Sequence, residues 1–142
     1  MTFESYVKSR LMDFVIDEAY SDGGVEPMLA VAQVLANRVK AGWQGGDWLR
    51  VIDTAPEYRG TVPARNYERI DPRDGNFREL MRRVDDVYHG TADDASVNNE
   101  SGTSLFYAEL HNVNREWFKE HILDDPESHP RLATVGQLTF FG

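Results

Sequence analysis

The chain has 142 residues, of which 41% are apolar and 11% aromatic, so it is long enough to bury a core and too apolar to be a disordered chain. Its formal net charge of -9 disfavours binding to nucleic acid through backbone phosphates. The chain contains no cysteine, which excludes a disulfide framework, a thiolate metal site and a cysteine nucleophile.

We expect a single domain, residues 1–142, made in the cytoplasm without a signal peptide, because segment 1–6 is polar and acidic. No apolar run approaches membrane-spanning length, so the sequence predicts no membrane partner. Charge is unevenly distributed. Residues 59–83 hold seven bases and four acids, whereas residues 84–130 hold eleven acids and two bases. The basic segment 59–83 either faces an anionic ligand or is a solvated helix face.

The first predicted helix spans residues 3–19, and Glu18 occupies the next position on its apolar stripe. That stripe consists of Val7, Leu11, Phe14 and Val15. A carboxyl group held inward, or in a cleft beside the core, is poorly solvated when charged, which raises its pKa toward the range that a general acid needs. The alternative is that Glu18 ends the helix by turning to solvent.

Further along, a breaker cluster at residues 21–24 separates this helix from a second one over residues 27–41. Asp47 is placed to cap a short third helix. Residues 54–75 contain several prolines and glycines that leave no room for a long regular element. A long irregular segment inside a compact domain is uncommon unless it is functional.

The second half combines one more long helix with short β elements. Residues 77–88 have helical periodicity, and Asn76 and Glu79 have the spacing of a capping box. The remaining elements are a polar loop (91–102), a short strand (103–108), a helix capped by Asn114 that runs to Leu123 and buries Trp117, Phe118 and Ile122, and a closing strand or hairpin (131–141). The sequence therefore predicts a mainly α, α+β fold with small β elements late in the chain.

The residue inventory favours carboxylate chemistry. The sequence has no Gly-x-Ser-x-Gly elbow, His-x-x-x-His pair or phosphate loop, so we expect neither a metal nor another cofactor. Glycosidic bonds are cleaved by a protonated carboxyl that donates to the leaving oxygen, usually with a second carboxylate roughly 5–9 Å away. Aromatic side chains such as Tyr58 offer flat faces for sugar rings, although a single aromatic is more often part of a core.

Several blocks resemble the cell-wall hydrolases related to the spore-cortex-lytic enzyme SleB. Residues 18–20 (Glu-Ala-Tyr), a glycine-containing turn and residues 35–39 (Leu-Ala-Asn-Arg-Val) are similar to the family's Glu-Ala-Arg-Gly-Glu signature and its Leu-x-Asn-Arg-Val helix end. Residues 103–107 resemble its aromatic strand, Trp117 its following tryptophan, and residues 133–141 its closing Ala-Thr-Ile-Gly-x-x-x-Phe segment. The resemblance runs from about residue 14 to the end.

This resemblance implies a lysozyme-like fold and a lytic transglycosylase that cleaves the bond between N-acetylmuramic acid and N-acetylglucosamine in peptidoglycan. Glu18 would be its acid and base, and no second carboxylate is needed, because the muramic 6-hydroxyl attacks C1 and closes a 1,6-anhydro ring. The implied substrate-binding positions are Asp22, Asn37, Glu57, Tyr58 and Tyr107. Asn37 and Arg38 equally suit hydrogen bonding between helices.

Departures from the family pattern leave alternatives open. Asp22 lies nearest the position of the family's second glutamate, and Glu57-Tyr58 replaces its Gln-Phe pair, so either acid could make the protein a true hydrolase. A non-catalytic wall-binding or structural tail module with the same fold is a further alternative. Without a leader, the expected setting is a phage protein that reaches peptidoglycan during lysis or as a virion component, with tail proteins as partners.

Overall fold

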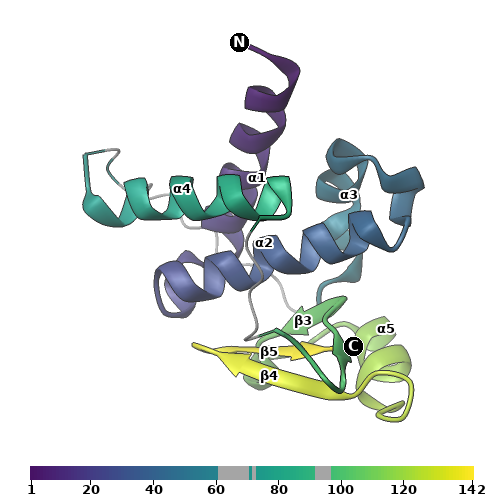
Figure 1. Ribbon diagram of the computed structural model, residues 1–142. Coiled ribbons are helices and arrows are strands. Elements are labelled where there is room, and N and C mark those ends of the chain that lie inside the picture. The colour runs from purple at the N-terminus through teal and green to yellow at the C-terminus, as the bar shows by residue number, and fades with distance from the viewer. Residues whose placement is uncertain (61–70, 72, 92–96) are drawn as a thin grey trace.

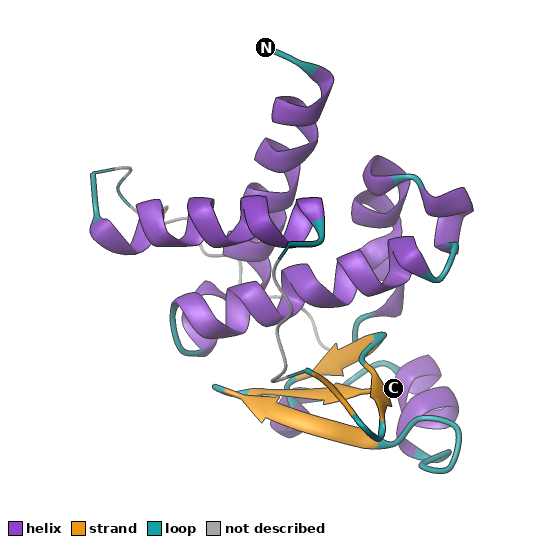
Figure 2. Cartoon of the chain, in the orientation of Figure 1, coloured by secondary structure: helices purple, strands orange, loops and turns teal. Residues whose placement is uncertain are grey.

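The computed structural model describes residues 1–60, 71, 73–91 and 97–142. Its helices are α1 (Phe3–Ala19), α2 (Val25–Lys40), α3 (Trp48–Thr54), α4 (Gly75–His89) and α5 (Glu116–Phe118). Its strands are β1 (Asn98–Asn99), β2 (Gly102–Thr103), β3 (Phe106–Ala108), β4 (Arg131–Val135) and β5 (Leu138–Phe141). Four 3-10 turns, η1 (Tyr20–Asp22), η2 (Trp43–Gly46), η3 (Ala55–Tyr58) and η4 (Leu110–Asn112), and one π-helical turn, η5 (Lys119–Leu123), complete the described elements. The predicted mainly α, α+β class is confirmed (Figure 2).

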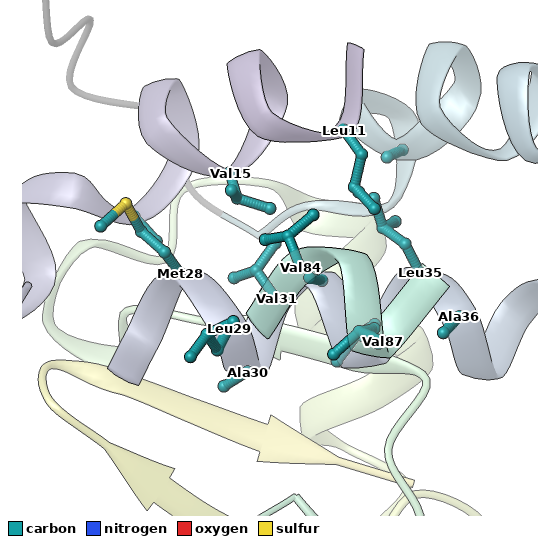
Figure 3. Close-up of a cluster of buried hydrophobic side chains, with 14 of the residues drawn as sticks. Leu11, Val15, Met28, Leu29, Ala30, Val31, Leu35, Ala36, Val84 and Val87 are labelled. Atoms are coloured by element: carbon teal, nitrogen blue, oxygen red, sulfur yellow. The ribbon is translucent and has the colours of Figure 1, made fainter. Parts of the chain in front are cut away.

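Helix α2 is the central element of the structure (Figure 1). Helices α1, α3 and α4 contact it, and strands β3 and β4 lie against it as well. Every residue from Pro27 to Arg38 is buried, as expected for a helix that is covered on all sides. In Figure 3, Leu11 and Val15 of α1 and Val84 of α4 lie against α2, the helix of Val31. This packing fixes the direction in which α1 enters the site described below.

The late strands form a three-stranded antiparallel sheet in the order β3-β5-β4. Alternate residues of a strand point to opposite faces, and both faces of this sheet are covered. Tyr107, Leu138 and Phe140 belong to the core shared with the helices. On the other face, a second cluster comprises Phe106, Ala108, Phe118, Ile122 and Phe141. Tyr107 therefore faces the helices from the middle of β3.

Helix positions follow the sequence closely, with corrections at several ends. The first helix and the closing hairpin are confirmed, and α2 begins at Val25, two residues earlier than expected. The capping box at Asn76 is wrong, because Asp74 caps α4 by accepting a hydrogen bond from the Asn76 amide at 2.9 Å. Asn114 does not cap the next helix either, which begins at Glu116 without a side-chain cap.

Two further expectations need correction. Trp117 is 37% exposed because α5 buries only Phe118 and the π-helical turn that follows buries Ile122. The strand expected over 103–108 is interrupted at Ser104, where the chain passes from one small sheet to the other. Much of the irregular 54–75 segment (61–70 and 72) and of the polar loop (92–96) lies outside the described residues. No helix within the described ranges is long and apolar enough to cross a membrane.

Candidate active site

Glu18 points inward from the last turn of α1, with only 6% of its side chain exposed. Val7, Leu11 and Val15, on the same stripe, are buried in the core, and their packing fixes the rotation of the helix. The position after Val15 on this stripe is therefore forced toward the interior. The alternative in which Glu18 turns to solvent does not hold.

Tyr107 contacts the first oxygen of this carboxyl group. Its hydroxyl donates a hydrogen bond to Glu18 Oε1 at 2.7 Å. The tyrosine is buried in the middle of β3, opposite Phe140 of β5, and the two rings lie 5.9 Å apart. Strand pairing and ring packing thus hold the hydroxyl in place against Glu18.

Arg59 contacts the second oxygen. Its Nη1 lies 3.0 Å from Glu18 Oε2, and its side chain is 11% exposed. The next residue, Gly60, is anchored through its carbonyl, which accepts hydrogen bonds from the amides of Asn114 at 3.0 Å and Arg115 at 3.3 Å. A Cβ atom at Gly60 would lie 2.8 Å from the Phe118 ring, so only glycine allows this close approach. The backbone beside Arg59 is therefore fixed.

Opposing effects act on the Glu18 carboxyl. Burial raises its pKa above the usual 4.5 and is the largest effect. The positive charge of Arg59, the Tyr107 hydrogen bond and the charge of Arg38 lower it in turn, while the neighbouring Asp17 adds a small increase. Burial prevails, so the pKa of Glu18 is raised. A carboxyl group with a raised pKa holds a proton closer to neutral pH, as a general acid requires.

A second acid, Asp22, lies near Glu18 in turn η1. It is only 7% exposed, and its pKa is raised from 3.8 to about 6 by burial first and then by the negative charges of Glu109 and Glu18. The Asp22 carbonyl accepts a hydrogen bond from the Gln137 amide at 2.9 Å. The structure thus brings Glu18, Asp22 and Tyr107 together, as three of the predicted site residues.

The hairpin between β4 and β5 holds Asp22 in this position. Gly136 has a φ of +58°, and a Cβ atom there would lie 2.1 Å from the Asp22 carbonyl oxygen. Only glycine satisfies both the left-handed backbone and this contact. The glycine of the closing motif is therefore explained by the approach of the hairpin to η1.

Asn37 lies apart from this cluster, buried between α2 and the strands. Its Nδ2 donates to Asn98 Oδ1 and to the Ser104 carbonyl, both at 2.8 Å, and Gln33 donates to its Oδ1 at 3.0 Å. Both amide hydrogens are thus used within the protein. The hydrogen bonding foreseen between helices is instead hydrogen bonding from a helix to the β elements.

Tyr58 and Glu57 also lie outside the immediate surroundings of Glu18. The Tyr58 ring is half-buried beside Trp43, with 4.9 Å between ring centroids, and beside Trp117, at 5.7 Å. Glu57 is exposed, and its backbone carbonyl accepts a hydrogen bond from Arg115 at 3.2 Å. Of the two acids considered as a second carboxylate, Asp22 is the one that interacts electrostatically with Glu18.

A cavity of about 740 Å³ lies elsewhere, between α1 and α4. Met12, Ile16, Phe77 and Met81 are among its lining residues, and Glu18 is not. Positions 16 and 18 of a helix point in nearly opposite directions. This cavity and the buried acid are therefore on different faces of α1.

Arg59 was not identified as a site residue from the sequence. The available signal was that the basic segment 59–83 begins with it, and an anionic ligand was one of the two interpretations of that segment. Its partner Glu18 is far away in the sequence, so no local periodicity connects the two residues.

No family model, curated protein or solved structure matches the chain. The resemblance to SleB-related hydrolases thus rests on the quoted motifs. Within the described residues, no group of three or more histidine and carboxylate side chains is arranged to hold a metal ion. The chemistry available at this site is proton transfer by Glu18, with Tyr107 and Arg59 as its immediate partners.

Proposed function

We propose that the protein is a peptidoglycan lytic transglycosylase that cleaves the bond between N-acetylmuramic acid and N-acetylglucosamine. The observation that carries this proposal is the nearly buried Glu18 carboxyl, whose pKa is raised by burial and which a tyrosine hydroxyl holds in place. The motifs around Glu18, Tyr107 and Gly136 support it, because they resemble those of wall hydrolases that use one glutamate.

In the proposed reaction, protonated Glu18 donates its proton to the glycosidic oxygen as the bond from that oxygen to C1 of the muramic residue breaks. The resulting carboxylate accepts the proton of the muramic 6-hydroxyl, whose oxygen forms a new bond to C1. Glu18 ends the cycle protonated, and the products are a 1,6-anhydro end and a free N-acetylglucosamine hydroxyl. The Tyr107 hydrogen bond stabilises the carboxylate formed midway.

A true hydrolase is the second candidate, and Asp22 is the observation that favours it. This buried acid lies near Glu18 and takes part in no hydrogen bond through its carboxyl group within the described residues. As a base, it would activate a water molecule in place of the muramic hydroxyl. Glu57 is the weaker choice because it is exposed.

The test of catalysis compares wild type with Glu18→Gln on permeabilised Gram-negative cells, following the loss of turbidity. We expect a loss of roughly 10²- to 10⁴-fold in rate, the usual contribution of a general acid or base. Glu120→Gln, on the exposed surface of η5, is the matched control and should clear cells like wild type. Equal clearing by wild type and Glu18→Gln would overturn the proposal. No clearing by any of the three would favour the non-catalytic tail module.

Mass spectrometry of the released fragments separates the two enzymatic candidates. Transglycosylation leaves 1,6-anhydromuramic ends, whereas hydrolysis leaves reducing ends one water heavier. If reducing ends are found, Asp22→Asn should abolish their formation while Glu57→Gln should not.

A further inference from the structure

Both oxygens of the proposed catalytic acid are occupied in the free protein. Tyr107 donates to Oε1, and Arg59 lies 3.0 Å from Oε2. A general acid must carry its proton on one of these oxygens and place that oxygen against the leaving group. Tyr107 is fixed within the sheet, so Oε2 is the oxygen that can become free. Its release requires that Arg59 moves.

Protonation of Glu18 also leaves Arg59 without its counter-ion. The guanidinium is almost covered, and its Nε is buried with no hydrogen-bond partner in the part of the chain that the structure describes. A buried charge that loses its partner is strongly disfavoured. Another anion beside Arg59 would restore its charge partner when Glu18 becomes neutral.

Among the charged groups that face Glu18, Arg59 is the one able to move. Arg38 is committed to the Leu105 carbonyl at 2.9 Å and to the surrounding rings. Asp17 and Asp22 are the other charged neighbours, and both are anions. An arginine side chain has several rotatable bonds, whereas the backbone beside Arg59 is held by the anchored Gly60. Movement is thus confined to the side chain.

We propose that Arg59 pairs with Glu18 in the free protein and transfers to a carboxylate of the bound glycan, while Glu18 takes up one proton from solvent. This inference rests on the proposed function and adds an anionic requirement to its substrate. Muramic residues supply such a group through the lactyl ether in strands without stem peptides, or through the acidic residues of the stem. The net charge around Arg59 is unchanged. The proton removes one negative charge from Glu18, and the carboxylate of the ligand brings one negative charge in its place.

The experiment measures binding and proton uptake with ligands that lack the cleaved linkage. The disaccharide N-acetylglucosaminyl-N-acetylmuramic acid carries a lactyl carboxylate, chitobiose is its neutral counterpart, and the same disaccharide with a stem peptide tests the second source. Titration calorimetry in buffers of different ionisation enthalpy counts the protons taken up. For wild type near pH 7, we expect uptake approaching about one proton with an anionic ligand and none with chitobiose.

Variants of the two partners make the test specific. Arg59→Gln should bind the anionic disaccharide about tenfold more weakly, as expected when a charge-assisted contact is lost, without proton uptake and with unchanged chitobiose binding. Arg59→Lys should restore part of the affinity. Arg50→Gln, at an exposed arginine of α3, removes the same charge and should behave like wild type.

Glu18→Gln keeps the inference testable if Arg59→Gln does not fold. Its side chain cannot titrate, so it should bind the anionic disaccharide at least as tightly as wild type and take up no proton. Proton uptake that persists in Glu18→Gln, or equal affinity of wild type and Arg59→Gln for the anionic ligand, would overturn the exchange. Uptake seen only with the stem-bearing ligand would support it and assign the carboxylate to the stem. Neither result depends on catalysis, so the cell-clearing assay judges the proposed function separately.

Discussion

Two arginines, Arg38 and Arg59, carry positive charges that lower the pKa of Glu18, and they are held in different ways. Arg38 is 1% exposed, donates to the Leu105 carbonyl, and lies over the rings of Trp43 and Phe106, with its Cζ 4.9 and 5.8 Å from their centroids. Arg59 lies against the carboxyl group of Glu18. One guanidinium has neutral partners, and the other has a partner that titrates.

This difference in partners makes the charge of Arg38 structural and allows Arg59 to exchange its partner. A carbonyl and aromatic faces cannot change their charge, so Arg38 connects α2 with β3 at every pH. Burial lowers its pKa without a carboxylate in direct contact to compensate. Glu18 becomes neutral when it binds a proton, which releases Arg59. The chain thus uses one arginine, Arg38, to join α2 to β3, and another, Arg59, to control the acid Glu18.

The largest effect that tests this comparison is on stability. Arg38→Ala should lower the free energy of unfolding by about 3 kcal/mol or more, because it leaves the Leu105 carbonyl unpaired and opens a cavity among three rings. Arg59→Ala should lower it by only about 1 kcal/mol near neutral pH, because Glu18 can take up a proton and avoid an uncompensated charge. Urea unfolding of both variants measures the difference. A smaller loss for Arg38→Ala than for Arg59→Ala would show that the structural role belongs to Arg59.

The sequence predicts the position of Glu18 better than that of Arg59. Helical periodicity placed Glu18 on the buried stripe, and the resemblance pointed to Tyr107, Asp22 and the closing hairpin. Periodicity works there because α1 is long and well packed. Arg59 follows a short 3-10 turn, where no repeating pattern shows which way a side chain points. Its pairing with Glu18 is a tertiary contact, invisible to local spacing.

The wrong predictions about the fold have the same origin. Trp117 was expected in the core because of its size, yet the three-residue α5 continues as a π-helical turn and leaves it 37% exposed. Asn76 was expected to cap α4, but Asp74, two positions earlier, is the cap, and both types of side chain suit an N-cap. Short elements and element ends are set by neighbours that the local sequence does not reveal.

The next largest effect concerns Asp22, the second buried acid near Glu18. Asp22→Asn should stabilise the protein above pH 6 and have little effect below pH 4. In the unfolded chain the Asp22 pKa is near 3.8 and in the fold it is about 6, so the folded state binds the extra proton and loses stability as pH rises between these values. Complete ionisation corresponds to about 3 kcal/mol at most, and we expect a gain of about 1 to 3 kcal/mol.

Urea unfolding of wild type and Asp22→Asn at pH 4 and pH 7.5 measures this gain. Asp124→Asn, at an exposed acid after η5, is the control and should show no comparable dependence on pH. A gain of the same size at both pH values would mean that the carboxylate charge of Asp22 is not what destabilises the folded protein.

The smallest expected effect on stability concerns the hydrogen bond from the Tyr107 hydroxyl to Glu18 Oε1. Tyr107→Phe keeps the ring against Phe140 and removes one hydrogen bond, so it should lower stability by only about 1 kcal/mol. The same hydrogen bond lowers the pKa of Glu18. Its loss should therefore raise that pKa further and move the high-pH limb of kcat/KM for glycan cleavage upward, because the acid stays protonated to higher pH.

Tyr88→Phe is the matched control, since its ring packs against Trp48 in the helical layer at 5.3 Å and should leave the limb unchanged. A limb that moves downward in Tyr107→Phe would mean that the hydroxyl donates to the protonated acid and not to the carboxylate. In that case Arg59 alone would hold the charge of Glu18. The exchange of Arg59 would then account for the whole difference between the resting and the active acid.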